Sequence, residues 1–341
     1  MRTILVTGAA GFIGSNFVRC LLGRGLEVRL IAYDKLTYAG NLTNLADFLG
    51  DKRLVFVKGD ICDGGALNRI WDEHKITQVV NFAAESHVDR SILGSEPFIR
   101  TNVVGTQVLL DVSRAKGVEK YLQVSTDEVY GSLPEDRPDL KFTEQTPLGP
   151  NSPYAASKAA ADCLVRAYFH TFQMPVLTTR CANNYGPYHF PEKLIPLFVT
   201  NLIEGKQVPL YGDGKNIRDW LYVEDHCDAI WTVLERGRFG EVYNIGGNNE
   251  ITNRNITETI LREMGKPWDQ FVKYVPDRPG HDRRYAIDAG KMRQELGWTP
   301  RHKFEDAIKT TIQWYLDHQD WWRAVKSGEY MKYYQQQYGK S

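Results

Sequence analysis

Short apolar, β-branched stretches alternate along the chain with stretches whose apolar residues recur every three or four positions. The strand-like stretches lie at residues 3–7, 27–33, 54–58, 78–82, 120–124, 175–180 and 241–245. Helical periodicity occupies residues 12–22, 65–74, 96–116 and 154–172, between the first six of them. Strands that alternate with helices form a parallel sheet that is covered by helices on both faces. The pattern therefore predicts an α/β fold with a doubly wound parallel sheet.

The character of the chain changes after about residue 180, where prolines, glycines and aromatics separate shorter elements. This change predicts a smaller, mixed α/β C-terminal lobe over the carboxyl ends of the strands. We expect a first domain at residues 1–182, with returning segments near 221–247, and a substrate-binding lobe formed mainly by 183–341. The stretch at 310–338 is dense in Trp and Tyr, and it is expected to pack as a closing helix.

Charge and composition argue against several classes of function. The chain has 341 residues with 42 basic and 42 acidic side chains, so it lacks the basic surface expected of a nucleic-acid-binding protein. It shows no leader segment and no apolar run of about 18 residues, so no membrane partner is expected. Five scattered cysteines without metal-ligand spacing favour reduced thiols and no metal. We therefore expect a cytoplasmic protein.

A glycine-rich segment follows the first predicted strand and opens the first predicted helix. Gly8, Gly11 and Gly14 permit a tight turn, close approach of a pyrophosphate, and close packing of helix on strand. The helix N-terminus presents free N–H groups to the phosphates. The spacing alone is a weak signal, and its position between strand and helix strengthens it. It predicts a dinucleotide site on a Rossmann-type sheet.

An acidic residue ends the second predicted strand. Asp34 lies 20 residues after Gly14, where a carboxylate can bind the adenosine ribose and repel a 2′-phosphate. This favours NAD over NADP, although Lys35 beside it points weakly the other way. Asp60 and Ile61, after the third strand, are expected near the adenine. A helix cap is an equally open interpretation of Asp60.

Two neighbouring carboxyl groups follow the fifth predicted strand, in Thr126-Asp127-Glu128. Neighbouring strand residues face opposite sides, so Asp127 and Glu128 can reach one ligand only if the backbone turns there. Ligands bind at the carboxyl ends of strands in such folds, and an acid beside a base can remove water from a substrate. An isolated pair of this kind is usually a solvated turn.

Tyr154 and Lys158 lie four residues apart at the start of a predicted helix, so their side chains share one face. Free tyrosine has a pKa near 10, too high for a base at neutral pH. A nearby ammonium group and a positive nicotinamide ring would favour the phenolate. The pair therefore predicts a hydride-transfer site.

Taken together, these segments resemble the extended short-chain dehydrogenase/reductase family. The matching motifs lie at residues 7–14, 81–84, 154–158, 183–187 and 218–225. The triplet at 126–128 is most similar to the nucleotide-sugar 4,6-dehydratases that act on dTDP-glucose. Sugar 4-epimerases lack the acid pair, UDP-glucuronate decarboxylases carry Ser in place of Asp127, and GDP-mannose dehydratases keep only the Glu.

The resemblance implies a reaction in three steps. Tyr154 takes the proton of the C4 hydroxyl while hydride passes from C4 to NAD; Lys158 lowers the pKa of Tyr154, and Thr126 bonds the C4 oxygen. Glu128 then removes the C5 proton, and a protonated Asp127 donates to the leaving C6 hydroxyl. Return of the hydride to C6 gives the 4-keto-6-deoxy sugar nucleotide.

The resemblance also implies the contacts of each ligand and a homodimer formed by a bundle of the helices at 96–116 and 154–172. The expected NAD contacts are Gly8, Gly11, Phe12, Ile13, Gly14, Asp34, Lys35, Leu36, Thr37, Asp60, Ile61, Phe82, Ala83, Ala84, Ser86, Thr101, Tyr154, Lys158 and Asn184. The expected contacts of the nucleotide-sugar substrate are Ser86, His87, Thr126, Asn183, Lys193, Leu194, Pro209, Tyr211, Arg218, Asn253, Asp277, Arg278 and His281.

Three alternatives stay open from the sequence. A UDP-glucose 4,6-dehydratase would carry the same triplet, because no residue separates thymine from uracil recognition. A nucleotide-sugar 4-epimerase would release no water. A non-catalytic NAD-sensing module would be expected to have lost Tyr154, Lys158 or the acid pair.

Overall fold

A seven-stranded parallel sheet forms the centre of the structure, a computed structural model that describes residues 2–326. The strand order is β10-β6-β5-β4-β1-β2-β3, and every neighbouring pair is parallel. The strands are β1 (Arg2–Thr7), β2 (Val28–Asp34), β3 (Leu54–Lys58), β4 (Gln78–Asn81), β5 (Lys120–Thr126), β6 (Val176–Cys181) and β10 (Val242–Ile245). The predicted Rossmann-type sheet is confirmed, with all seven strands within two residues of their expected bounds.

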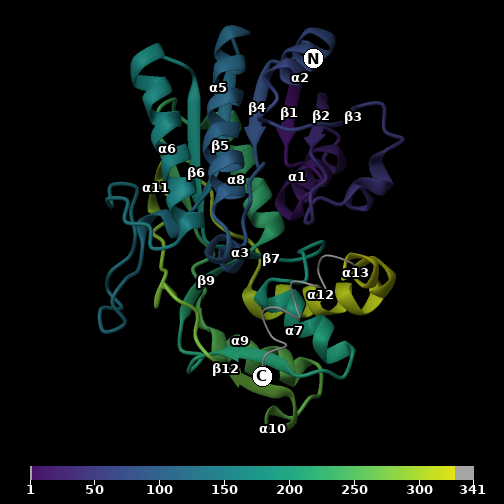
Figure 1. The fold of residues 1–341 in the computed structure, drawn as a ribbon, viewed down its shortest axis with the longest axis vertical. Helices are drawn as coiled ribbons and strands as arrows, with labels where there is room; N and C mark the ends of the chain where they lie inside the picture. The colour runs from purple at the N-terminus through teal and green to yellow at the C-terminus, as the bar shows by residue number, and fades with distance from the viewer. Residues whose placement is uncertain (1, 327–341) are drawn as a thin grey trace.

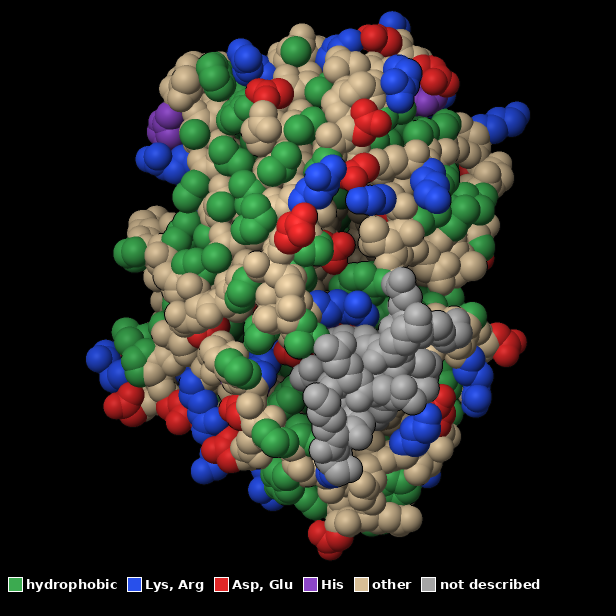
Figure 2. Space-filling model, in the orientation of Figure 1, with side chains coloured by type: hydrophobic (Ala, Val, Ile, Leu, Met, Phe, Trp, Pro, Cys, Tyr) green, Lys and Arg blue, Asp and Glu red, His purple; other side chains and the backbone are tan. Residues whose placement is uncertain are grey.

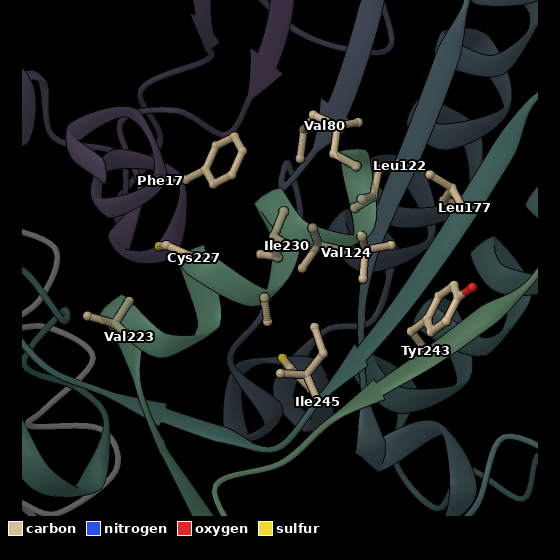
Figure 3. Close-up of a cluster of buried hydrophobic side chains, with 14 of the residues drawn as sticks. Phe17, Val80, Leu122, Val124, Leu177, Val223, Cys227, Ile230, Tyr243 and Ile245 are labelled. Atoms are coloured by element: carbon tan, nitrogen blue, oxygen red, sulfur yellow. The ribbon is translucent and has the colours of Figure 1, made fainter. Parts of the chain in front are cut away.

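Helices cover both faces of this sheet (Figure 1). One face carries α1 (Phe12–Gly23), α8 (Val223–Arg236) and α11 (Gly290–Leu296). The other carries α2 (Gly64–His74), α5 (Thr106–Ala115) and α6 (Pro153–Phe172). Alternation along the strands supplies both cores, because Leu122 packs on the first face and its neighbour Tyr121 on the second. Figure 3 shows Leu122 in the first core, with Phe17 of α1 and Ile230 of α8.

The expected single helix at 96–116 is wrong in its first half. The chain forms α4 (Glu96–Phe98), a π-helical segment η2 (Ile99–Gly105), and then α5. Four β-branched residues in η2 and Gly105 at its end have low α-helical propensity. Gly105 also packs against Ile61, where a Cβ would lie 2.6 Å from the Ile61 Cδ1 atom. Wide helical turns are frequent at functional sites.

Shorter elements complete the sheet region. They are the 3₁₀ segments η1 (Leu42–Phe48) and η3 (Asp127–Tyr130) and the helix α3 (Val88–Leu93). The η3 turn follows β5 directly, so the backbone turns where the acid pair required it to turn. Among the described residues, no helix is long and apolar enough to cross a membrane.

A second group of elements lies beyond one end of the sheet (Figure 1). It contains a three-stranded sheet, β11-β9-β7, and a two-stranded sheet, β12-β8, and it packs around a separate apolar core. Its strands are β7 (Asn183–Tyr185), β8 (Val208–Tyr211), β9 (Ile217–Tyr222), β11 (Glu250–Thr252) and β12 (Val272–Val275). Its helices are α7 (Leu194–Ile203), α9 (Asn253–Glu263), α10 (Trp268–Phe271), α12 (Phe304–Asp317) and α13 (Gln319–Val325). Of the aromatic stretch at 310–338, the part after residue 326 lies outside the described residues.

Candidate functional site

A cavity of about 400 Å³ lies between the carboxyl ends of the sheet strands and the second group of elements. Figure 2 shows a hollow there, with Lys, Arg, Asp and Glu side chains around it. The expected NAD contacts that line the cavity are Gly8, Gly11, Phe12, Ile13, Gly14, Asp34, Lys35, Thr37, Asp60, Ile61, Phe82, Ala83, Ala84, Ser86, Thr101, Tyr154, Lys158 and Asn184. The expected substrate contacts that line it are Ser86, His87, Thr126, Asn183, Lys193, Leu194, Pro209, Tyr211, Arg218, Asn253, Arg278 and His281.

Three residues expected at the site lie outside the cavity wall. Leu36 turns through a positive φ of 56° and donates its N–H to Asp34 Oδ1, at 2.8 Å. Asp277 accepts hydrogen bonds from the Arg278 N–H and from His281 Nδ1, so it orients residues that do line the cavity. Asp127 is buried behind Thr126 and Glu128, both of which line the cavity.

The glycine-rich turn has room for a ligand and none for side chains. A Cβ on Gly8, which has a φ of +62°, would lie 2.7 Å from the Ala83 nitrogen. A Cβ on Gly14 would overlap the carbonyl oxygen of Gly8. Helix α1 begins after Gly11 without a side-chain cap and without an acidic residue in its first turn. Its free N–H groups and partial positive charge therefore suit an anionic pyrophosphate.

Acidic residues mark the adenosine end of the cavity. Asp34 accepts the N–H of Ala10 at 2.9 Å, which ties the end of β2 to the glycine turn. Lys35 forms an ion pair with Asp60, with 2.7 Å between Nζ and Oδ2. The positive charge of Lys35 is therefore already balanced by a carboxylate of the chain. The cap interpretation of Asp60 is wrong, because Asp63 caps α2 by accepting the N–H of Ala66. The residues at this end fit a dinucleotide without a 2′-phosphate.

The acid pair lies at the start of η3. The Thr126 hydroxyl caps this turn by accepting the N–H of Glu128 at 3.2 Å, and it donates to Asp127 Oδ1 at 3.3 Å. The other carboxyl oxygen of Asp127, Oδ2, is buried and has no hydrogen-bond partner among the described residues. A buried carboxylate in that position would be costly, whereas a neutral carboxyl is tolerated.

The two carboxyl groups differ in their surroundings. Burial, followed by the charge of Glu128, raises the pKa of Asp127 well above its ordinary value. Burial also raises the pKa of Glu128, but the charges of Arg278, Lys193 and Arg218 oppose this shift. Asp127 is therefore the group that holds its proton more strongly, and Glu128 is the group that ionises more easily.

Tyr154 and Lys158 lie on the first turns of α6, which Ser152 caps by accepting the N–H of Ala155. Burial, followed by the nearby charge of Glu128, raises the pKa of Tyr154. The expectation that Lys158 and a positive nicotinamide ring together favour the phenolate stays a prediction. The Lys158 ammonium donates to the carbonyl of Val124, at 2.8 Å, and burial lowers its own pKa. This hydrogen bond fixes the ammonium group of Lys158 at β5.

Two arginines define the opposite end of the cavity. Arg218 on β9 donates to the carbonyl of Asp282 at 2.8 Å and stacks over the ring of Tyr285 at 4.2 Å. Arg278, in the loop after β12, donates through Nη1 to Asp89 at 2.9 Å. Guanidinium groups held in this way suit the oxygens of a diphosphate.

Polar atoms without partners lie along the same wall. The Oδ1 atoms of Asn183 and Asn253 and the Nε of Arg278 are buried and have no hydrogen-bond partner within the described chain. Buried polar groups are normally paired, so such atoms mark a place where a ligand would complete the bonding. Lys193 also faces this region and donates to the carbonyl of Ser86 at 2.8 Å.

His87 has a local structural role. Its Nδ1 caps α3 by accepting the N–H of Arg90, at 3.4 Å, and burial lowers its pKa to about 4. It also lines the cavity, so its structural role is compatible with the predicted substrate contact, and that contact stays a prediction. His281 also stays neutral, because burial and the charge of Arg278 lower its pKa to about 4.

Several cavity residues were not predicted as site residues. Among them are Glu85, Asp89, His189, Phe190 and Glu192. Asp89 lies in the first turn of α3, where an acidic residue is common for structural reasons alone, so no sequence pattern marked it as a site residue. Glu192 forms a buried ion pair with Arg90, at 3.0 Å, and no local pattern announces it.

Comparison with known proteins agrees with this geometry. Residues 5–311 match the sequence model of the family described as GDP-mannose 4,6 dehydratase. The chain belongs to this family. The family is part of the extended short-chain dehydrogenase/reductases, which confirms the resemblance found in the motifs.

Relatives about half identical to the chain over nearly their whole length include dTDP-glucose 4,6-dehydratases. A dTDP-glucose 4,6-dehydratase of Xanthomonas campestris is 54% identical over 347 residues, covering 97% of each chain. One of Escherichia coli is 49% identical, covering 96% of this chain and 97% of that protein.

Solved structures of family members have the same fold. A dTDP-glucose 4,6-dehydratase of Streptomyces venezuelae with NAD bound has a TM-score of 0.92 at 51% identity, covering 96% of this chain and all of that chain. One of Bacillus anthracis in complex with NAD has a TM-score of 0.89 at 52% identity, with the same coverage. A UDP-glucose 4-epimerase of Thermotoga maritima is more distant, with a TM-score of 0.84 at 30% identity, covering 92% of this chain and 99% of that chain.

Proposed function

We propose that the chain is a dTDP-glucose 4,6-dehydratase that converts dTDP-glucose to dTDP-4-keto-6-deoxyglucose and water with tightly held NAD. The observation that carries this proposal is the placement of Asp127 and Glu128. One carboxyl is buried with a strongly raised pKa, and its neighbour is surrounded by cations, beside the cavity of the glycine turn. The similarity to dehydratases over the whole length supports the same reaction.

Oxidation at C4 is the task proposed for the first group of residues. When bound, NAD supplies the acceptor for the C4 hydride and later returns that hydride to C6. Tyr154 takes the proton of the C4 hydroxyl, and Thr126 hydrogen-bonds the C4 oxygen. Lys158, anchored on the carbonyl of Val124, holds the Tyr154 turn in place and adds a positive charge near the base.

Elimination of water is the task proposed for the acid pair. The C4 ketone makes the C5 hydrogen acidic, and Glu128 removes it as the general base. Asp127 donates its proton to the C6 hydroxyl, which leaves as water while the C5–C6 double bond forms. The same surroundings that divide the two pKa values support this division of roles, which the sequence alone left open. A proton returned to C5 then completes the product.

The diphosphate of the substrate is assigned to Arg218, Arg278 and Lys193, whose charges surround Glu128. Asn183 and Asn253 offer the buried unpaired oxygens described above. Asp34 and Asp60 are assigned to the adenosine of NAD. These assignments place the cofactor at the glycine turn and the sugar between Tyr154 and the acid pair.

The proposal extends to the organisation of the molecule. A domain at 1–182 with returning segments near 221–247 is supported by β10 and α8, which pack on the sheet, and the 183–341 lobe by its separate core. A homodimer is supported by exposed apolar side chains on α3, η2 and α6, namely Ile92, Leu93, Ile99, Val104 and Phe172. Unpaired cysteines support a cytoplasmic location.

The test is incubation of the purified chain with dTDP-glucose or UDP-glucose and no added NAD. We expect a 4-keto-6-deoxy product from dTDP-glucose, detected by mass spectrometry as a loss of water and by the absorbance of the ketone in base. If UDP-glucose is converted and dTDP-glucose is not, the chain is a UDP-glucose dehydratase instead. Formation of a C4 epimer without loss of water would overturn the proposal.

A further inference from the structure

Asp89 connects the sheet region to the end of β8 and to the loop that follows β12. It lies in the first turn of α3, and its carboxylate accepts hydrogen bonds from Arg278 Nη1 at 2.9 Å and from the Tyr211 hydroxyl at 3.1 Å. Tyr211 ends β8 and pairs with Val275 at the end of β12, three residues before Arg278. One buried carboxylate therefore holds two side chains that come from adjacent strand ends.

Both partners of Asp89 line the cavity at its cationic end. Arg278 keeps its Nε buried and without a hydrogen-bond partner in the described chain, while Nη1 is held by Asp89. A guanidinium with one end fixed presents its other donors in a defined plane, which is what bidentate binding of phosphate oxygens requires. Without the fixed end, a long side chain would lose rotamer freedom when it bound.

We propose that Asp89 is a positioning residue for the diphosphate of a nucleotide-sugar substrate, acting through Arg278 and Tyr211. The inference rests on the proposed function, because it names how that same site holds its substrate. The side chain of Asp89 is only 6% exposed, and both of its oxygens are used by these partners. The negative charge of Asp89 is therefore held against side chains of the cavity wall.

The charge balance of this corner is consistent with that role. The Arg278 guanidinium overcomes the effect of burial and keeps the pKa of Asp89 below its usual range, so the carboxylate stays ionised. Arg218 and Lys193 remain as further cations near the same position. The corner can therefore accept a diphosphate even though it contains Asp89.

The first test compares Asp89→Asn with the wild type at saturating and limiting dTDP-glucose. We expect KM to rise at least about tenfold, the usual scale for a lost hydrogen bond to a charged group. We expect kcat to change less than about threefold, because Arg278 and Tyr211, the two side chains that Asp89 holds, are not among the five proposed catalytic residues. Calorimetric binding of dTDP alone should weaken by the same factor as KM.

Asp228→Asn is the matched control. Asp228 is also a largely buried carboxylate, paired with Arg24 and accepting from Trp298 Nε1 at 3.0 Å, but it lies outside the cavity. We expect this variant to lower the melting temperature and to leave KM and dTDP affinity unchanged. A rise of KM in Asp228→Asn equal to that in Asp89→Asn would reduce the Asp89 effect to general destabilisation and overturn the proposal.

A double-mutant cycle with Arg278→Lys isolates the positioning effect. If Asp89 acts through Arg278, the double variant should bind dTDP little worse than Arg278→Lys alone. Fully additive losses would overturn the inference. If Asp89→Asn does not fold, Tyr211→Phe is the substitute, because it removes one partner of the Asp89 carboxylate. We expect this variant to raise KM about threefold. An unchanged KM in Tyr211→Phe would count against the proposed role of Asp89.

The two proposals fail in different ways. If the wild type does not convert dTDP-glucose, the proposed function falls, while calorimetry with dTDP still tests Asp89. If the wild type is active and Asp89→Asn binds dTDP as tightly as the wild type, the role of Asp89 falls and the proposed function stands.

Discussion

Asp127 and Glu128 are neighbours in the chain but lie in different electrostatic surroundings. Asp127 is 1% exposed, with one oxygen unpaired, whereas Glu128 lines the cavity and faces three cations. Like charges beside each other already separate two pKa values, and the unequal surroundings decide the direction. At the scale of single residues, the structure therefore favours one assignment of acid and base.

Replacing Glu128 by Gln should abolish most dehydration. Loss of a general base costs at least about 100-fold, so product formation from dTDP-glucose should fall by that factor while NAD stays bound. Stopped assays of the ketone and the absorbance of released NAD measure the two quantities. Glu73→Gln on the exposed side of α2 is the control and should keep wild-type activity. A fully active Glu128→Gln variant would refute the assigned base.

Replacing Asp127 by Asn should remove a pH dependence of stability. Asp in an unfolded chain titrates near 3.9, whereas burial raises the pKa of folded Asp127 well above that. The folded state therefore holds a proton that the unfolded state releases. This contribution is full below the unfolded pKa and is lost as pH rises through the folded pKa.

The measurement is urea unfolding of the wild type and Asp127→Asn from pH 4 to pH 9. As pH rises, the free energy of unfolding of the wild type should fall relative to that of Asp127→Asn. The variant should have lost its dehydratase activity at every pH. A difference between the two that does not change with pH would contradict the raised pKa.

At the scale of elements, the position of the first turn of α1 depends on close packing between its backbone and the backbone of the glycine turn. Gly14 permits the first turn of this helix to lie against the carbonyl of Gly8, and Gly8 itself lies against Ala83. The π-helical η2 is a second such element, because Gly105 lets it approach Ile61, and Thr101 in the same segment lines the cavity. These close backbone contacts shape the end of the cavity that is proposed to bind NAD.

Gly14→Ala should therefore displace α1 and weaken NAD binding. Overpacking of this kind costs about 1–3 kcal/mol of stability, and the bound NAD per chain should fall. Gly23→Ala is the matched control in the same helix, since a Cβ there meets nothing within 4 Å. Gly23→Ala should keep its NAD and gain up to about 1 kcal/mol from helix propensity. Equal NAD content in the two variants would contradict the packing argument.

At the scale of the whole molecule, the cavity exists only because the second group of elements lies over the carboxyl ends of the strands. Arg90 and Glu192 pair across this junction, as do Asp89 and Arg278. Open parallel sheets place ligand sites at this edge, where the strand order reverses between β1 and β4. Exposed large apolar side chains lie elsewhere, among them Ile92 and Leu93 on α3, Ile99 and Val104 on η2, and Phe172 on α6.

The proposed homodimer predicts a mass of two chains by light scattering. Ile99 and Val104 are 47% and 45% exposed on η2, so the double variant Ile99→Glu/Val104→Glu should separate the subunits by placing charges in an apolar contact. Leu49→Glu is the control, because Leu49 is 46% exposed but follows η1 on a different part of the molecule. A monomeric wild type, or a dimeric double variant, would refute this surface as the contact.

The sequence by itself determined the parallel sheet, the glycine turn, the acid pair and the Tyr154–Lys158 pair. Each of these is a local pattern: hydrophobic period, glycine spacing, or residues four apart on one helix face. The tertiary structure alone decided that Asp127 is the more strongly protonated carboxyl and that Asp63, not Asp60, caps α2. It also showed that burial raises the pKa of Tyr154.

The tertiary structure likewise revealed that Asp89 holds Arg278, a residue 189 positions away in the chain. The physical reason is common to all these cases. Burial and Coulomb interactions depend on which groups meet in space, and a pKa or an ion pair is set by neighbours that lie far apart in sequence.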